Sequence, residues 1–202
     1  KENSRMAGDY ILRELAKQYA VFVPWNPHAF RAIPYFMFSF EFSRSFFKSR
    51  TLKSIHVYGM ADGSLARCGV SVCFNASGAH KANEYYFLNP GTHMAQLKTF
   101  LSDRLGVLER DAMFKKVFLA DFLDCDSVCI ALKKRFIGLY FSRIKLEQFQ
   151  YFLRKFGYPD ELNQFVRLNR KRLDHMLYDV AFDVSLHNKK IVYGKSSFYG
   201  SF

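Results

Sequence analysis

The sequence has no apolar run that approaches the roughly 20 residues a transmembrane helix needs, because charged residues interrupt every apolar stretch. Its first residues lead into an amphipathic pattern and not into the apolar core of a secretory signal. Tryptophan occurs once, at Trp25, and the chain holds five prolines. These features predict a protein of the cytoplasm with no transmembrane segment.

Several motifs of catalytic and metal sites are missing. The cysteines are spaced C-x4-C at 68 and 73 and C-x3-C at 125 and 129, which fits neither common zinc sites nor a small disulfide framework. We therefore expect reduced, buried thiols. The six histidines show no H-x3-H or H-E-x-x-H spacing, and no G-x-S-x-G elbow or Gly-rich phosphate loop occurs. A hydrolase is not expected, and no metal site is predicted from the histidines.

One acidic run precedes a predicted strand. It contains Asp121, Asp124 and Asp126, and carboxylates of this kind are suitable ligands for Mg²⁺. Three acidic residues before a strand more often form a loop, and we favour that interpretation.

What the chain has in excess is positive charge and aromatic side chains. Lysine and arginine number 30 against 18 acidic residues, which gives a formal net charge of +12. The electrostatic field of such a positively charged protein attracts nucleic acid, an anionic membrane surface or a polyanionic small molecule such as a diphosphate. Half of the residues are apolar, with 23 phenylalanines and 12 tyrosines, and 202 residues are enough for a core. We expect a single domain over residues 1–202.

The hydrophobic pattern alternates between helical and strand periods. Apolar residues at helical spacing predict helices over 4–19, 92–105 and 145–156, and alternation predicts a strand over 35–42. Three hairpins are predicted, which pair 51–58 with 65–74, 127–132 with 135–141, and 176–184 with 191–202. Segment 114–122 is ambiguous, and 159–172 is a basic helical or irregular piece.

This order predicts an α+β protein. Adjacent strands joined by tight turns form antiparallel pairs, and a helix after each pair shields one face of the sheet. We expect an antiparallel β-barrel or a strongly curved sheet built from α-β-β-α repeats, with the helices outside. A lumen lined by side chains can hold a ligand.

The last strand carries the most informative pattern. Alternation from 193 to 199 predicts that Tyr193, Lys195, Ser197 and Tyr199 share one face. A lysine beside tyrosines suits an anion next to an aromatic surface, and aromatic rings stabilise a developing carbocation. An edge-strand lysine that guards against aggregation is the alternative interpretation of Lys195.

Other cations are candidates for binding the same anion, with weaker support. Lys116 and Lys134 lie in paired-lysine runs beside predicted strands, and Arg170 lies in the basic run 167–172. Converging cations would form a phosphate-binding cluster without a P-loop. Paired lysines at turns are more often solvated, and a basic run is more often a solvated helix face.

Four segments resemble the ABBA-type aromatic prenyltransferases, whose fold is an antiparallel barrel ringed by helices in α-β-β-α repeats. The run KKRFIGLYFS at 133–142 is similar to a family strand KKRxVNLYFS, and FKKVF at 114–118 resembles the family's FKKTY. KSSFY at 195–199 looks like the C-terminal K-x-x-x-Y strand, and VYGMADG at 57–63 resembles the first hairpin turn.

The resemblance implies roles for individual residues. It implies that Lys116, Lys134 and Lys195 bind the diphosphate, that Tyr140 and Tyr199 are catalytic, and that Phe118 belongs to the aromatic wall. From the basic run and the strand alternation we add Arg170 to the diphosphate contacts and Tyr193 to the aromatic wall. Gly138 stands where the family has an asparagine that faces the diphosphate.

The resemblance also implies a metal-independent enzyme, because Gly69 falls near a position where some members carry a magnesium-binding aspartate. Mg²⁺ stays as the alternative. The chain is shorter than is usual for the family and does not begin with Met, so we expect either a smaller or open barrel, or an incomplete chain.

Two functions from different classes follow. The first is transfer of a prenyl group from an allylic diphosphate to an aromatic or otherwise electron-rich acceptor. The second is nucleic-acid binding, in which an exposed aromatic sheet stacks bases while the positive field follows phosphates. A related version is a basic subunit of a larger assembly. The enzyme requires the aromatic rings inside a cavity, whereas the nucleic-acid binder requires them on an open sheet face.

Overall fold

The structure is a computed structural model that describes residues 35–40, 44–61, 67–105, 120–188 and 190–201, together with helical residues within 10–17. The chain divides into two compact units, Lys1–Tyr85 and Tyr86–Phe202, and each is described by itself. The prediction of a single domain over 1–202 stays a prediction. Among the described residues, no helix combines the length and the apolar character needed to cross a bilayer.

The first unit contains a meander of antiparallel strands. β1 (Tyr35–Phe40) pairs with β2 (Ser54–Ala61), and β2 pairs with β3 (Arg67–Asn75). The short helix α2 (Arg44–Ser49) lies between β1 and β2, and β4 (Gly78–Leu88) follows β3 in the sheet order. Ile55 and Val57 of β2 are fully buried. The hairpin predicted over 51–74 is therefore confirmed, whereas α2 and β4 were not predicted.

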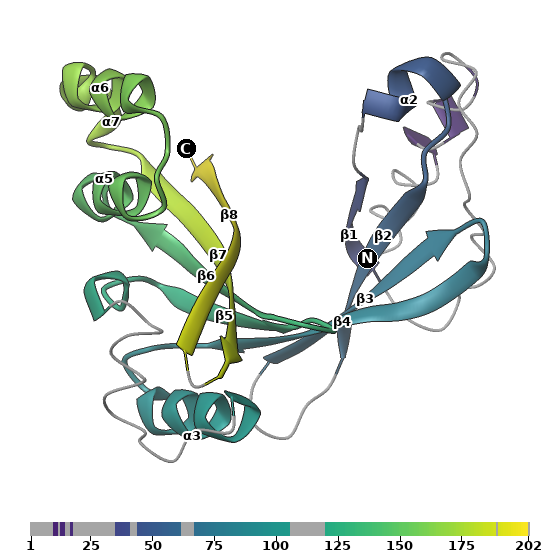
Figure 1. Ribbon diagram of the computed structural model, residues 1–202, viewed down its shortest axis with the longest axis horizontal. Coiled ribbons are helices and arrows are strands. Elements are labelled where there is room, and N and C mark those ends of the chain that lie inside the picture. Colours follow the sequence, from purple (N-terminus) through teal and green to yellow (C-terminus); the bar gives the residue numbers. More distant parts are fainter. Residues whose placement is uncertain are drawn as a thin grey trace. The chain divides into compact units, whose positions relative to one another are not determined.

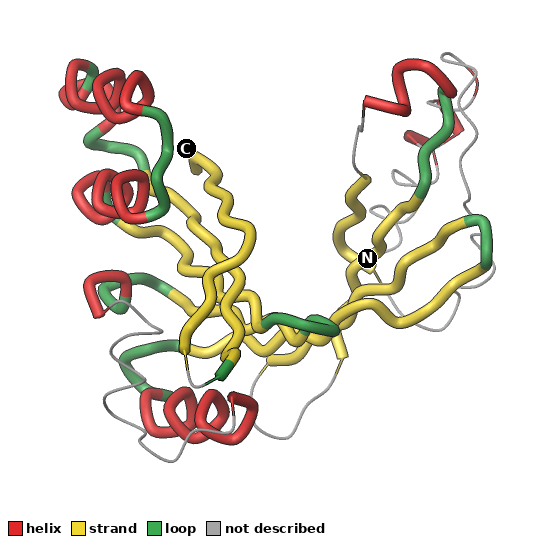
Figure 2. Tube along the Cα trace, in the orientation of Figure 1, coloured by secondary structure: helices red, strands yellow, loops and turns green. Residues whose placement is uncertain are grey.

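The second unit begins with α3 (Met94–Leu105) and the short 3₁₀ helix η2 (Ala120–Phe122). β5 (Ser127–Leu132) and β6 (Ile137–Ile144) form a hairpin, and α5 (Leu146–Lys155), α6 (Asp160–Leu168) and α7 (Arg170–Leu173) follow. β7 (Leu177–His187) pairs with both β6 and β8 (Lys190–Ser201). Both predicted hairpins of this unit and both of its predicted helices are confirmed (Figures 1 and 2).

The core of the second unit is an aromatic layer between α5 and the sheet. Phe149 of α5 stacks on Tyr178 of β7 with ring centroids 4.2 Å apart, and Phe156 lies 4.9 Å from Phe182. Phe182 in turn stacks on Phe141 of β6. We call these rings, with Phe122, Phe152, Tyr158, Tyr193 and Phe198, the aromatic layer. Figure 1 shows α5 beside the strands β6, β7 and β8.

The end of α5 is fixed by its sequence. Gly157 has a φ of 65°, a left-handed conformation that glycine adopts without the cost of a Cβ clash. The amide of Tyr158 donates to the carbonyl oxygen of Leu153, which satisfies a carbonyl of the last turn. Pro159 then caps the start of α6, and the end of α5 agrees with the helix predicted over 145–156.

These observations confirm the α+β class and the antiparallel sheet. They do not confirm a closed barrel, because no pairing among the described strands joins β8 to β1. In the second unit, α5 covers one face of the sheet, which agrees with helices on the outside of a curved sheet.

The aromatic layer predicts a large cost for removing a buried ring. Phe152 is fully buried, and its ring lies 4.7 Å from Phe156, so we expect Phe152→Ala to lower the free energy of unfolding. The expected loss is about 3–5 kcal/mol in urea titrations, and Phe152→Leu should lose less. Phe165 is 56% exposed on α6 and provides the control, because Phe165→Ala should change stability by less than about 1 kcal/mol. Equal losses in Phe152→Ala and Phe165→Ala would contradict this account of the core.

Candidate functional site

The sheet of the second unit has a second face, opposite the aromatic layer. Side chains alternate between the two faces of a strand, so the neighbours of Leu139, Phe141, Val180 and Phe182 point away from α5. The cross-strand register places these neighbours in rows: Ala131, Gly138 and Asp183; Cys129, Tyr140, Ala181 and Ser197; and Asp179 with Tyr199. We call this the polar face.

Three predicted site residues come together on the polar face. Tyr140 lies in register with Ala181, which pairs with Ser197 of β8. Lys195 precedes Ser197 by two residues and Tyr199 follows it by two, so alternation places all three on the side away from Phe198. In this row of the register, the small residue Ala181 of β7 separates Tyr140 from Ser197 of β8.

Tyr193 lies on the opposite face, and the prediction that it shares a face with Lys195 was wrong. The register shifts between Phe182 and Val184, so that Gly194 and Lys195 together oppose Asp183. Such a bulge adds one residue to β8 and reverses the alternation. The Tyr193 ring therefore packs in the aromatic layer, 5.6 Å from Phe156 and 5.8 Å from Phe182. Burial, and secondarily Tyr151, raises the pKa of its hydroxyl.

Lys133 crosses the polar face in a way that the sequence did not indicate. Its Nζ lies 2.5 Å from Oδ1 of Asp183 and 5.8 Å from the centre of the Tyr140 ring. The two side chains of the ion pair are 27% and 15% exposed, so solvent screens the pair only partly. Lys133 thus joins the set of polar-face residues, although the resemblance pointed to its neighbour Lys134.

Gly138 makes this crossing feasible. A Cβ added at Gly138 would lie 2.9 Å from Cε of Lys133, 3.1 Å from the Tyr140 ring and 3.2 Å from Oδ1 of Asp183. Any side chain at this position would displace Lys133 from Asp183. Gly138, which stands where the prenyltransferases have an asparagine, thus leaves a space over the sheet that the Lys133 side chain fills.

The other predicted cations lie elsewhere. Lys134 is exposed at the β5–β6 turn, where it lines a groove that we describe below. Arg170 is exposed at the start of α7 and pairs with Glu147 of α5. Lys116 and Phe118 lie outside the described residues, so their roles stay predictions.

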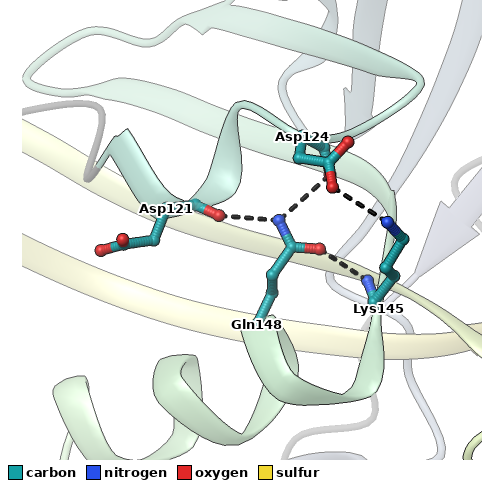
Figure 3. A network of polar contacts seen from close by, with 4 residues as sticks. All are labelled: Asp121, Asp124, Lys145 and Gln148. Carbon is teal, nitrogen blue, oxygen red and sulfur yellow. Dashed lines mark hydrogen bonds and ion pairs between the residues drawn. The ribbon is translucent and has the colours of Figure 1, made fainter.

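The acidic run comprises η2 and the loop before β5, and it is bound to the start of α5 by hydrogen bonds and an ion pair (Figure 3). The Gln148 amide donates to the carbonyl oxygens of Asp121 and Asp124, at 2.7 and 3.0 Å. Lys145 Nζ lies 3.0 Å from a carboxylate oxygen of Asp124, and Arg143 pairs with Asp126 at 2.7 Å. Two of the three carboxylates are thus in contact with cations. The loop interpretation is confirmed for Asp124 and Asp126, whereas Asp121 lies in η2.

The prediction of reduced, buried thiols is confirmed in part, because Cys68 and Cys125 are only half-buried. All four are free, and Cys73 and Cys129 are buried. Burial raises the pKa of the Cys129 thiol to about 12, and burial together with Asp126 and Asp124 raises that of Cys125 to about 12. A thiol with such a pKa is a poor nucleophile at neutral pH, so neither residue is a candidate for covalent catalysis.

Comparisons with protein-family models, with curated proteins and with solved structures find no match to this chain. The function of the chain is therefore inferred from its own geometry and from its resemblance, in short motifs, to the prenyltransferases.

The Lys133–Asp183 pair can be tested by a double-mutant cycle on unfolding free energies. We expect Lys133→Met and Asp183→Asn to be coupled by about 1 kcal/mol or more, because both side chains are mostly buried and tyrosine adds a cation–π contact. The matched control is Arg170→Met with Glu147→Gln, a pair that is 54% and 57% exposed. Its coupling should stay below about 0.5 kcal/mol. A Lys133–Asp183 coupling no larger than that of the exposed pair would show that Lys133 is not held on the polar face.

Proposed function

We propose that the protein transfers a prenyl group from an allylic diphosphate to an aromatic or otherwise electron-rich acceptor. The observation that carries the proposal is the joint placement of Lys195, Tyr140 and Tyr199 on the polar face. These are the residues to which the motif resemblance gives the diphosphate contact and the aromatic wall. A second cation, Lys133, lies on the same face.

The proposed chemistry divides between cations and rings. Lys195 binds the diphosphate and neutralises the charge that develops as the C–O bond to the allyl group breaks and its electron pair leaves with the diphosphate. Tyr140 and Tyr199 stabilise the allyl cation and shield it from water. The acceptor then donates a π electron pair to the cation, a C–C bond forms, and a proton leaves the acceptor ring.

The floor of the polar face suits a flat or extended ligand. Ala181 and Ser197 are small and share a row with Tyr140, between the row of Tyr199 and the row of Asp183 and Lys195. Small side chains at the centre of a sheet face leave room for a bound molecule, whereas larger ones would fill that space.

We also propose that the sheet is part of a barrel or strongly curved sheet of α-β-β-α repeats, whose lumen is the polar face. The support is the helix α5, which covers the other face through the aromatic layer. Lys116 and Phe118 keep their proposed roles in diphosphate binding and in the aromatic wall. Metal independence is likewise kept as a proposal, on the ground that Gly69 replaces the aspartate of the resemblance.

Nucleic-acid binding is the second candidate, and one observation favours it. Tyr199 is 59% exposed on the sheet surface, as a base-stacking residue would be, and the net charge is +12. A binder of this kind loses affinity steeply as salt rises.

The enzyme proposal is tested by incubation with dimethylallyl and geranyl diphosphate across a library of aromatic acceptors, read by mass spectrometry. We expect prenylated product, and we expect Lys195→Met to weaken donor binding in calorimetry by about tenfold, the value of one charge-assisted contact. Lys190→Met, an exposed lysine of the same strand, is the matched control and should leave binding unchanged. Unchanged donor affinity in Lys195→Met would remove the assignment, and steep salt-dependent binding of an oligonucleotide without product would favour the second candidate.

A further inference from the structure

A groove of about 340 Å³ lies at the end of the sheet in the second unit, where β5 turns into β6. Its described lining comes from three separate segments: Arg104 at the end of α3, residues 132–137 around the turn, and residues 184–186 of β7. Lys195 and Tyr199 are not part of this lining, whereas Lys133 belongs both to the lining and to the polar face. The groove therefore adjoins the proposed donor site but offers a different set of residues to a ligand.

The charges of this groove are of one sign. Arg104, Lys133, Lys134 and Arg135 line it, and no aspartate or glutamate occurs in its described lining. Lys133 is engaged by Asp183, which leaves Arg104, Lys134 and Arg135 to interact with a bound anion. A second groove, of about 400 Å³ between α5 and α6, shows the contrast, because there Arg154 and Arg167 share the lining with Asp160 and three side-chain amides.

Local structure fixes the backbone that carries two of the cations and the side chain of a third. The amide of Lys133 donates to the carbonyl oxygen of Phe136 at 3.0 Å, which closes a tight turn with Lys134 and Arg135 at its centre. Across the groove, the guanidinium of Arg104 lies 5.5 Å over the ring of Phe100, and Phe100 packs 4.8 Å from Tyr86. A site whose charged groups are already positioned loses less conformational entropy when it binds a ligand.

The groove also has an apolar wall. Leu132, Phe136, Ile137, Val184 and Leu186 contribute to its lining. Apolar side chains beside a cluster of arginine and lysine fit a molecule with an anionic head and an apolar body. The planar guanidinium groups of Arg104 and Arg135 match the oxygens of a phosphate group better than ammonium groups do.

We propose that this groove is a binding site for a small molecule that carries a phosphate or diphosphate group on an apolar body, separate from the donor site on the polar face. Arg104, Lys134 and Arg135 bind the phosphate oxygens, and Phe136 with the leucines contacts the apolar body. The position of Lys134, which the sequence suggested as a diphosphate ligand of the donor site, is explained by this second site.

Calorimetric titration of the full chain with phenyl phosphate and with inorganic phosphate tests the proposal. We expect phenyl phosphate to bind more tightly than inorganic phosphate, because only phenyl phosphate reaches the apolar wall. Arg104→Gln combined with Arg135→Gln should lower the affinity for phenyl phosphate by about tenfold or more, since two charge-assisted contacts are lost. The matched control, Arg154→Gln with Arg167→Gln, removes the same charge from the mixed groove and should change affinity by less than about twofold, because long-range charge effects are screened by salt.

The outcomes separate this site from the donor site and from a nucleic-acid surface. Lys195→Met should leave phenyl phosphate binding unchanged, so a failed donor assignment does not affect this test. Equal losses in the two double variants, or no loss in Arg104→Gln with Arg135→Gln, would overturn the proposal. So would equal affinity for the two phosphates, or displacement of phenyl phosphate by an oligonucleotide that binds more tightly. Circular dichroism of the double variant establishes that it is folded.

Discussion

The second unit depends on the aromatic layer that α5 forms with β6, β7 and β8. Rings from the helix and from three strands pack at centroid separations of 4.2 to 5.8 Å, and this packing decides which face of the sheet is core. Because side chains alternate along a strand, the same choice assigns the other face to Tyr140, Asp183, Lys195 and Tyr199, and Lys133 reaches it from the β5–β6 turn. The polar face is therefore a consequence of the core.

Two aspartates of β7 mark the places where the strand register changes. Asp183 lies opposite the bulge at Gly194 and Lys195, and Asp179 lies opposite a second bulge at Ser142 and Arg143 of β6. The carboxylate of Asp179 accepts the amide of Arg143, which has a φ of 62°, at 2.8 Å. Asp183 accepts Lys133. Each bulge thus coincides with a polar contact across the polar face, as is common where strands bend around a functional surface.

The sequence predicted the elements whose pattern is local. The helical period over 145–156 and the alternation within three hairpins were enough, because each pattern spans a whole element. β4 and α2 were missed, since β4 begins with a polar stretch and α2 has only six residues. In the site, Lys195 and Tyr199 were correctly placed on one face because the period of two holds between them. Tyr193 was misplaced because the bulge depends on pairing with a distant strand, and Lys133 was passed over in favour of Lys134 because its path over Gly138 depends on tertiary contact.

The central claim is that the polar face binds an allylic diphosphate with Lys195 at the diphosphate and Tyr140 and Tyr199 beside the prenyl chain. A crystal structure with geranyl thiodiphosphate, a donor analogue that reacts slowly, tests it most directly. The account predicts electron density over Ala181 and Ser197, with diphosphate oxygens within about 3 Å of the Lys195 ammonium, the length of a charge-assisted hydrogen bond. Density for the analogue away from the polar face, or a Lys195 side chain that points away from a diphosphate bound there, would contradict it.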